Sequence, residues 1–416
     1  MSSTETNHVA AHSTGSVAVK AAHQPDWADP ELLAEVLAQL GERPPLVSAE
    51  SVRALSGELE FVARGEAFVI QAGECAELFA DSGHARIQHK SAQLHQLADR
   101  MEEVGLPTVR LGRFAGQYAK PRSSRTETSP DGTVVPSYFG DAVNEVSPTT
   151  AARRLDPARL LSAYDHAAGA LDALFMRQLL LSEGASGVSS MLAPTYISHE
   201  ALLLDFEHSL IRTDHVKGSS YASSAHQLWI GERTRQLDHA HIKFAEAINN
   251  PVGVKLGPTA EPREVAELGE RLAAGRTIGR LSLVVRMGAR QLAGRLPAII
   301  DALGPRAREV VWLCDPMHGN TVHAEDGTKT RVLSHVLAEV DQFYEVLRAQ
   351  GCWPGGLHLE ATPDDVTECV DSPDELTSTP ACRRFESACD PRLNPTQAEQ
   401  VVRRATVNTV FRPKQD

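Results

Sequence analysis

Residues 309–321 place several reactive side chains directly after a short apolar stretch. Residues 310–313 are all apolar, which is the pattern of a buried strand. Cys314, Asp315, His318 and Asn320 follow, and a proline and a glycine among them favour a turn. Parallel α/β folds carry their chemistry at the carboxyl ends of such strands, so the pattern predicts a functional end. A polar turn in which His318 is only hydrogen-bonded explains the same residues, and this stretch alone does not separate the two interpretations.

Other apolar runs in the chain end in the same way. Charged or amide side chains stand at or just beyond the ends of six further runs: Gln71, Arg113, Glu232, Arg233, Lys255, Arg286 and Glu360. If these runs are parallel strands of one barrel, their ends meet on one face and the side chains converge.

The same face would gather many cations, namely Arg113, Lys120, Arg122, Arg233, Lys255, Arg286 and Lys329. Arginine forks suit phosphate and carboxylate oxygens, and the number exceeds what one phosphate needs, so we expect two or more anionic groups in the ligand. Pairing with the chain's own carboxylates on a solvated face explains any single arginine equally well. It explains Lys255 and Arg286 less well, because each ends an apolar strand where an unpaired charge is costly to bury.

Four further residues could bind a metal: Cys75, His318, Glu360 and Asp390. A thiolate, an imidazole and two carboxylates suit Zn²⁺, Mn²⁺, Co²⁺ or Fe²⁺ better than Ca²⁺ or Mg²⁺. They are far apart in the sequence, so only the fold could bring them together. A buried structural thiol explains Cys75 by itself, and a turn before a proline explains Asp390. We assign His358, inside the last apolar run, to the core.

The elements that must position these residues alternate between strands and amphipathic helices. Strands are expected at 68–71, 108–113, 227–231, 252–256, 281–286, 310–314 and 357–360, with an eighth at 187–192. Eight βα units predict a (β/α)₈ TIM barrel, whose core usually takes about 250 residues. An open doubly wound sheet is the second interpretation, but no glycine-rich phosphate motif follows the first strand.

The chain divides into a tail, a helical extension and the barrel. Residues 1–25 lack periodicity, and we expect a disordered tail. Residues 26–65 predict an N-terminal extension of two helices, and residues 66–416 the barrel catalytic domain. The segment 119–144 is rich in proline, serine, threonine and glycine, and it predicts a long loop at the barrel mouth.

Composition excludes several classes of protein. The 416 residues have a net charge of −13, which argues against a nucleic-acid surface. No apolar run approaches the roughly 18 residues of a membrane-spanning helix, and the polar N-terminus lacks the apolar core of a secretory signal. Six cysteines in a chain of this length do not form a disulfide scaffold, so we expect a cytoplasmic protein. The N-terminal helices favour a homo-oligomer, either a dimer or a tetramer.

Six motifs resemble those of the class II 3-deoxy-D-arabino-heptulosonate 7-phosphate (DAHP) synthases. They are GECAE at 73–77, RFAGQYAKPRS at 113–123, WIGERTRQLD at 229–238, NPVGVKLG at 250–257, CDPMHGNT at 314–321 and ACDPRLN at 388–394. The resemblance covers most of residues 60–395. It implies a TIM-barrel transferase, 3-deoxy-7-phosphoheptulonate synthase, that condenses phosphoenolpyruvate with erythrose 4-phosphate at the start of the shikimate pathway.

The resemblance also implies roles for individual residues. The implied metal ligands are Cys75, His318, Glu360 and Asp390, with Mn²⁺ or Co²⁺ as the first expectation and Zn²⁺ or Fe²⁺ as alternatives. The implied phosphoenolpyruvate site consists of Arg113, Glu232, Arg233, Lys255 and Arg286, of which Lys255 and Glu232 are also expected to be catalytic, together with His318. Lys120, Arg122, Ser123 and Lys329 would face the sugar phosphate. Cys389, beside Asp390, is a conceivable disulfide partner of Cys75 when no metal is bound.

One departure from the family concerns regulation. Longer members carry an additional helical pair where residues 181–200 make a short connection, and that pair helps to form feedback sites for aromatic amino acids. We therefore expect no feedback inhibition by Trp, Phe or Tyr. An enzyme of secondary metabolism, acting on an amino or otherwise modified four-carbon aldose phosphate, is the alternative within the family.

Two hypotheses lie outside this chemistry. A Schiff-base aldolase would use Lys255 as its nucleophile. A non-catalytic barrel that binds sugar phosphates would be expected to lack at least one ligand or phosphate-binding position, and the motifs lack none.

Overall fold

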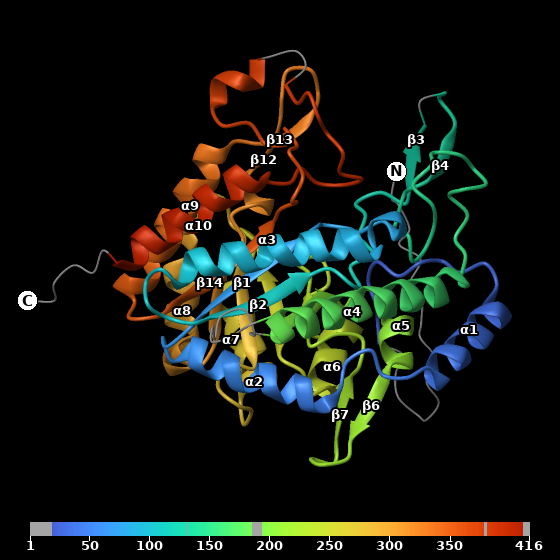
Figure 1. The fold of residues 1–416 in the computed structure, drawn as a ribbon, viewed down its shortest axis with the longest axis horizontal. Coiled ribbons are helices and arrows are strands. Elements are labelled where there is room, and N and C mark those ends of the chain that lie inside the picture. The colour runs from blue at the N-terminus through green and yellow to red at the C-terminus, as the bar shows by residue number, and fades with distance from the viewer. Residues whose placement is uncertain (1–18, 130, 185–193, 378–380, 411–416) are drawn as a thin grey trace, which may run out of the picture.

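The computed structural model describes residues 19–129, 131–184, 194–377 and 381–410. Eight parallel strands close into a barrel in the order β1-β14-β11-β10-β9-β8-β5-β2 (Figure 1). Their bounds are β1 Phe68–Gly73, β2 Thr108–Arg113, β5 Thr195–Glu200, β8 Gln227–Ile230, β9 Val252–Leu256, β10 Leu281–Val285, β11 Val311–Cys314 and β14 Pro354–Glu360. The predicted TIM barrel is therefore confirmed, with seven strands where the sequence indicated them.

The eighth strand differs from its prediction. The segment 187–192 lies outside the described residues, and β5 begins after it, at Thr195. Only Tyr196 and Ile197 are apolar in β5, whose sequence is TYISHE, so it lacks the longer apolar run that identified the other strands.

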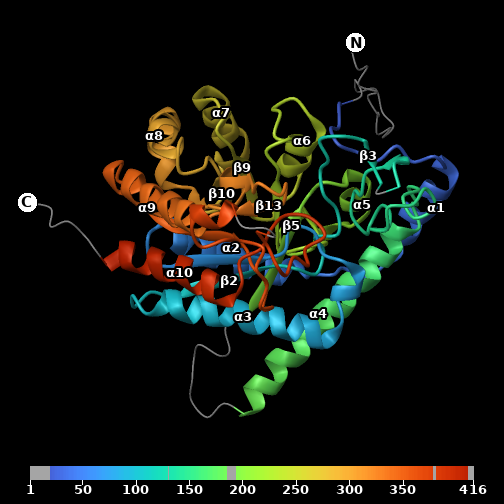
Figure 2. The ribbon, with the colours of Figure 1, turned by 90° about the horizontal axis from the view of Figure 1, so that it is seen from above.

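A helix follows each barrel strand, and the helices form the outer layer (Figure 2). They are α3 His84–Glu102, α4 Arg159–Gly184, α5 Leu204–Ser209, α6 Ala240–Ala247, α7 Pro262–Ala273, α8 Leu292–Leu303, α9 Leu333–Ala349 and α10 Pro395–Val410. Short 3₁₀ helices occur at Phe79–Asp81, Gly304–Arg308, His318–Asn320 and Pro373–Thr377. No helix in the described segments is both long and apolar enough to cross a membrane.

Two helices precede the barrel, α1 Pro30–Glu42 and α2 Ala49–Ala63. The carboxylate of Asp29 accepts a hydrogen bond from the Leu32 backbone N–H at 2.9 Å, and the Ser48 hydroxyl caps α2 in the same manner. The apolar face of α2 packs into the amino-terminal end of the barrel against inward side chains of the strands, including Val69, Val109, Leu111, Val284, Val311 and Leu313. One end of the barrel is thus closed by α2, which leaves the other end for ligands.

Above this apolar floor the barrel interior becomes polar. Gln71 donates a hydrogen bond to Ser198 Oγ at 2.9 Å and accepts one from His358 Nδ1 at 2.6 Å. Gln227 accepts a second hydrogen bond from Gln71 at 3.2 Å and donates one to Ser282 at 3.1 Å. These contacts link five strands across the interior. His358 is fully buried in this layer, as expected of a core residue. The layer separates the apolar floor from the charged residues at the carboxyl end.

Three antiparallel hairpins extend the loops. They are β3 Thr126–Thr128 with β4 Val134–Pro136, β6 Ile211–Asp214 with β7 Ser219–Ala222, and β12 Thr321–His323 with β13 Lys329–Arg331. The first lies within the long loop expected at 119–144.

The predicted N-terminal tail is only partly described, from residue 19 onward. The Lys20 carbonyl accepts a hydrogen bond from the Ala240 N–H at 2.9 Å, and Gln24 donates one to the Leu202 carbonyl at 2.7 Å. Residues 20–24 therefore pack against the barrel and correct the expectation of a tail that is disordered through residue 25.

Candidate active site

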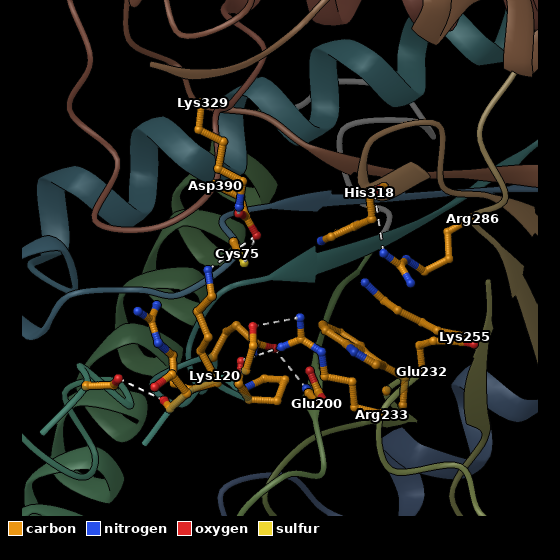
Figure 3. A pocket seen from close by; sticks show the side chains of 18 of the residues that line it. Cys75, Lys120, Glu200, Glu232, Arg233, Lys255, Arg286, His318, Lys329 and Asp390 are labelled. Carbon is orange, nitrogen blue, oxygen red and sulfur yellow. Dashed lines mark hydrogen bonds and ion pairs between the residues drawn. The ribbon is translucent and has the colours of Figure 1, made fainter. Parts of the chain in front are cut away.

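A pocket of about 470 Å³ opens at the carboxyl ends of the strands (Figure 3). Of the thirteen predicted site residues, only Glu360 is absent from its lining, and it lies buried beside His318. The other twelve, which include every predicted cation, are Cys75, Arg113, Lys120, Arg122, Ser123, Glu232, Arg233, Lys255, Arg286, His318, Lys329 and Asp390. The fold therefore brings together side chains that are scattered over three hundred residues of sequence.

Four of these side chains meet at one point. Cys75, His318, Glu360 and Asp390 each offer a ligand atom, and these atoms all lie within 4.8 Å of one another. His318 Nε2 lies 2.8 Å from Glu360 Oε1, and Cys75 Sγ lies 3.1 Å from Asp390 Oδ2. One sulfur, one nitrogen and two carboxylates at such distances form a possible site for a transition metal.

The Cys75 thiol also hydrogen-bonds Cys389, and both are free thiols in this structure. That hydrogen bond, burial and the negative charge of Asp390 raise the pKa of Cys75 well above its usual value. The disulfide between the two remains a prediction.

Asp315 fixes the orientation of His318. Its carboxylate lies 2.7 Å from His318 Nδ1 and accepts backbone hydrogen bonds from Met317 and His318 at 3.1 and 3.2 Å. Nδ1 therefore carries the proton, and Nε2 faces the other ligand atoms. Burial alone would raise the pKa of Asp315, but the charges of His318 and Lys255 hold it well below its usual range.

Cations surround the two carboxylates of this possible metal site. Glu360 forms ion pairs with Arg331 at 2.7 Å and Arg113 at 3.3 Å, while Asp390 pairs with Lys120 at 3.3 Å and with Lys329. Burial opposes ionisation of Glu360, yet His318 and Arg331 lower its pKa well below the usual value. Both carboxylates are thus kept ionised, as metal ligands must be. Arg331 was not predicted, since nothing in the sequence marks it off from other arginines in loops.

Trp229 organises the cations on the opposite wall. The Lys255 ammonium lies 5.5 Å from the centre of its ring and the Arg113 guanidinium 5.4 Å, which are cation–π distances. Burial lowers the pKa of Lys255, and the Asp315 carboxylate, at 3.3 Å, opposes that shift. Within the described residues, Arg286 donates a single long hydrogen bond, 3.4 Å, to the His318 carbonyl. Its remaining N–H groups are available to an anionic ligand.

Glu232 lines the pocket, and its predicted catalytic role remains a prediction. Its carboxylate accepts hydrogen bonds from Arg235 at 3.1 and 3.2 Å, from the Gly257 N–H at 2.6 Å and from Thr259 at 3.1 Å. These contacts involve both oxygens, so the carboxylate also holds the loop after β9.

Glu200 is a site residue that the sequence analysis missed. It ends β5 and lines the pocket, and its Oε1 atom is buried without a hydrogen-bond partner. Burial raises its pKa, against the lowering effect of Lys255 and other cations. Gly231 makes room for it, because a Cβ there would lie 2.2 Å from Oε1. The rule that located the other site residues would have located Glu200 had β5 been recognised.

The side of the pocket formed by the long loop carries hydroxyl groups and one ion pair. Arg122 pairs with Glu127 at 3.0 Å, and Arg233 lies 3.5 Å from Ser123 Oγ. Arg122 is therefore present in the pocket but already has a carboxylate partner.

Ionic contacts beneath the pocket link the two loops that carry Cys75 and Asp390. Arg392, two residues after Asp390, donates to Glu74 at 2.8 Å and to Glu368 at 2.7 and 3.0 Å. Glu74 directly precedes Cys75, so one buried guanidinium links the segments that carry two of the four possible ligands.

Comparisons with known proteins agree with this geometry. The family model described as the class-II DAHP synthetase family matches residues 12–194 and 174–404. A protein of Streptomyces coelicolor named phospho-2-dehydro-3-deoxyheptonate aldolase is 42% identical over 418 residues, covering 91% of this chain and 93% of that protein. The corresponding protein AroG of Mycolicibacterium smegmatis is 39% identical over 427 residues, covering 92% and 91%.

A solved structure of phospho-2-dehydro-3-deoxyheptonate aldolase from Francisella tularensis has the same fold. It matches with a TM-score of 0.52 at 13% identity, and covers 94% of this chain and 100% of that one. At this identity the likeness concerns the fold alone. The family match and the two relatives concern the sequence itself, and they show that the chain belongs to the class-II DAHP synthetase family.

Proposed function

We propose that this DAHP synthase condenses phosphoenolpyruvate with erythrose 4-phosphate in the pocket described above. The observation that carries the assignment to this pocket is the convergence of four possible metal ligands beside seven cations in about 470 Å³. Both substrates are anionic, and the cations suit their phosphate and carboxylate groups.

The metal site would be formed by Cys75, His318, Glu360 and Asp390. The mixed donors and the carboxylate behind His318 fit Mn²⁺ or Co²⁺, and also accommodate Zn²⁺ or Fe²⁺. When bound, a divalent ion supplies Lewis acidity toward a carbonyl oxygen.

The protein's own residues would hold the two substrates in line. Phosphoenolpyruvate would lie against Arg113, Arg233, Lys255, Arg286 and the Glu232 segment, and the sugar phosphate against Lys120, Arg122, Ser123 and Lys329. Such positioning lowers the barrier by bringing the reacting carbons together. It also sets cations around the phosphate that departs.

The reaction forms a bond between C3 of phosphoenolpyruvate and the aldehyde carbon of the sugar. Water adds at C2, the bond from C2 to the phosphate oxygen breaks, and inorganic phosphate leaves. The aldehyde oxygen gains a proton and becomes a hydroxyl group. Lys255, whose pKa is lowered by burial, is suited to donate that proton from Nζ, and Glu200 is suited to accept one from the water.

The test is phosphate release from phosphoenolpyruvate with a panel of four-carbon aldoses, with chelator and with Mn²⁺ or Co²⁺ added back. We expect activity with erythrose 4-phosphate to be lost with chelator and restored by metal. Cys75→Ala should lose metal binding, whereas Cys352→Ala, at a buried thiol outside the pocket, should retain it. Activity that survives chelation, together with trapping of Lys255 by borohydride, would support the Schiff-base alternative instead.

The same assay addresses the acceptor and regulation. A preference for an amino or otherwise modified aldose would favour the secondary-metabolic alternative. We also propose that Trp, Phe and Tyr do not inhibit, because α4 ends at Gly184 and β5 begins at Thr195, which is too short a connection for a helical pair. Inhibition by several-fold would contradict this. A homo-oligomer, dimer or tetramer, is proposed as well, and its mass in solution tests it.

A further inference from the structure

A second group of cations lies at the opposite end of the barrel from the active site. It lines a groove of about 580 Å³ between α2, the β6–β7 hairpin and the segment after α7. We call this the basal groove, and its charged residues are Arg53, Asp214, Lys217, Arg276 and Arg280. Arg280 directly precedes β10, whose other end leads to Arg286 in the active-site pocket. The two sites are therefore separated by the length of a barrel strand.

The positive charge of the basal groove is not balanced by the protein. Arg53 pairs with Asp214, whose other oxygen accepts the Val216 backbone N–H at 2.9 Å. Among the described residues, Lys217, Arg276 and Arg280 have no carboxylate within ion-pairing distance. Four cations thus face one carboxylate, in a chain whose net charge is −13.

Arg280 is the fixed element of the groove. It is 4% exposed, and its guanidinium donates to the carbonyl groups of Leu272, Ala245 and Ile248 at 2.7 Å each. Its Nε atom is buried without a hydrogen-bond partner. Its hydrogen bonds go to neutral carbonyl groups, and no carboxylate of the described residues lies within ion-pairing distance, so an anion bound close to this buried charge would stabilise it.

We propose that the basal groove binds a small organic anion that carries a phosphate group. Guanidinium and ammonium groups together favour phosphate oxygens. The groove volume falls in the range of about 300–1,000 Å³ that small-molecule sites occupy, so it accommodates a metabolite and not merely an ion. Val52 and Tyr221 form apolar walls for the carbon skeleton.

Glycerol 3-phosphate is a suitable probe, titrated into the full-length protein by calorimetry. We expect two binding events in the wild type, one in the active-site pocket and one in the basal groove. Lys217→Gln combined with Arg276→Gln should weaken the second event about tenfold or more, since two charge-assisted contacts are lost. Both residues are exposed, and Arg276 donates only to Asn249 Oδ1 and the Glu246 carbonyl among the described residues, so the fold should persist. Arg280 is left intact because it is buried and ties three carbonyl groups.

Two further variants separate the sites. Arg154→Gln with Arg263→Gln removes the same charge from exposed positions outside both cavities and should keep both events. Arg286→Gln should weaken the pocket event and leave the groove event. An isotherm unchanged by Lys217→Gln with Arg276→Gln would overturn the proposal, as would loss of all binding in Arg286→Gln. Loss of only the pocket event in Arg286→Gln would support the groove proposal, and this holds whichever reaction the pocket catalyses.

Discussion

Arg392→Met should loosen the two loops that carry Cys75 and Asp390. The substitution removes the guanidinium that joins Glu74 and Glu368, and all three side chains are at least nine-tenths buried. Glu74 would retain Lys90 at 3.3 Å, and Glu368 would retain backbone N–H groups, including that of Ser387 at 2.8 Å. Removing one partner of a buried ion pair costs about 3–5 kcal/mol, against a total stability of about 5–15 kcal/mol for a folded domain.

Two measurements follow from this magnitude. Melting followed by circular dichroism should shift downward by several degrees in Arg392→Met. Competition with a chromogenic chelator should show Mn²⁺ affinity lowered by about 10- to 100-fold, the usual effect of losing a group behind metal ligands. Arg403→Met is the control, because Arg403 pairs with Glu399 at 3.2 Å on the exposed surface of α10, where a pair contributes about 0–1 kcal/mol. If Arg392→Met melts and binds Mn²⁺ as Arg403→Met does, the loops are held by other contacts and the reasoning fails.

Three other predictions concern proton transfer by Glu200, the pH dependence of stability and the effect of replacing two glycines. Glu200→Gln should lower kcat by about 10²-fold or more with little change in melting temperature, measured by phosphate release; an unchanged kcat would exclude a role in proton transfer. Burial lowers the pKa of His226 to about 3, so the unfolded chain binds more protons below pH 6.5 and stability should fall by about 3 kcal/mol from there to pH 4. Urea unfolding at several pH values tests this, and His226→Gln should flatten the slope while His215→Gln, at an exposed position, should not. Gly169→Ala, in α4 with nothing within 4 Å of its added Cβ, should stabilise by about 1 kcal/mol, whereas Gly140→Ala, at φ 109° and 2.2 Å from the Tyr118 carbonyl, should destabilise; equal melting temperatures would contradict both.

Much of the site followed from one rule, that polar side chains at the ends of apolar strands converge in a parallel barrel. The rule located Lys255, Arg286 and His318 because their strands are apolar on both faces. It missed Glu200 because β5 mixes polar residues into its sequence. It could not find Arg331, since that residue reaches Glu360 from a hairpin after the strand.

The role of a side chain depends on contacts that sequence does not specify. Glu232 stands at a strand end like the others, yet its carboxylate turns toward Arg235 and the Gly257 backbone. Residues 20–24 lack any periodic pattern but pack through the Lys20 carbonyl, which any residue could supply, and through the side chain of Gln24. Such tertiary contacts determine the structure where the local sequence pattern gives no prediction.

The barrel closes by pairing its first strand with its last, β1 with β14. Cys75 follows the first and Asp390 lies beyond the last, so the ion site needs segments from both extremes of the barrel. During synthesis on the ribosome, the segment that carries Cys75 emerges long before the segment that carries Asp390, so the two cannot meet until nearly the whole polypeptide has been made. Ion binding at the proposed site would therefore require a completely synthesised chain, and a translation product truncated before Asp390 would lack one of the four ligands.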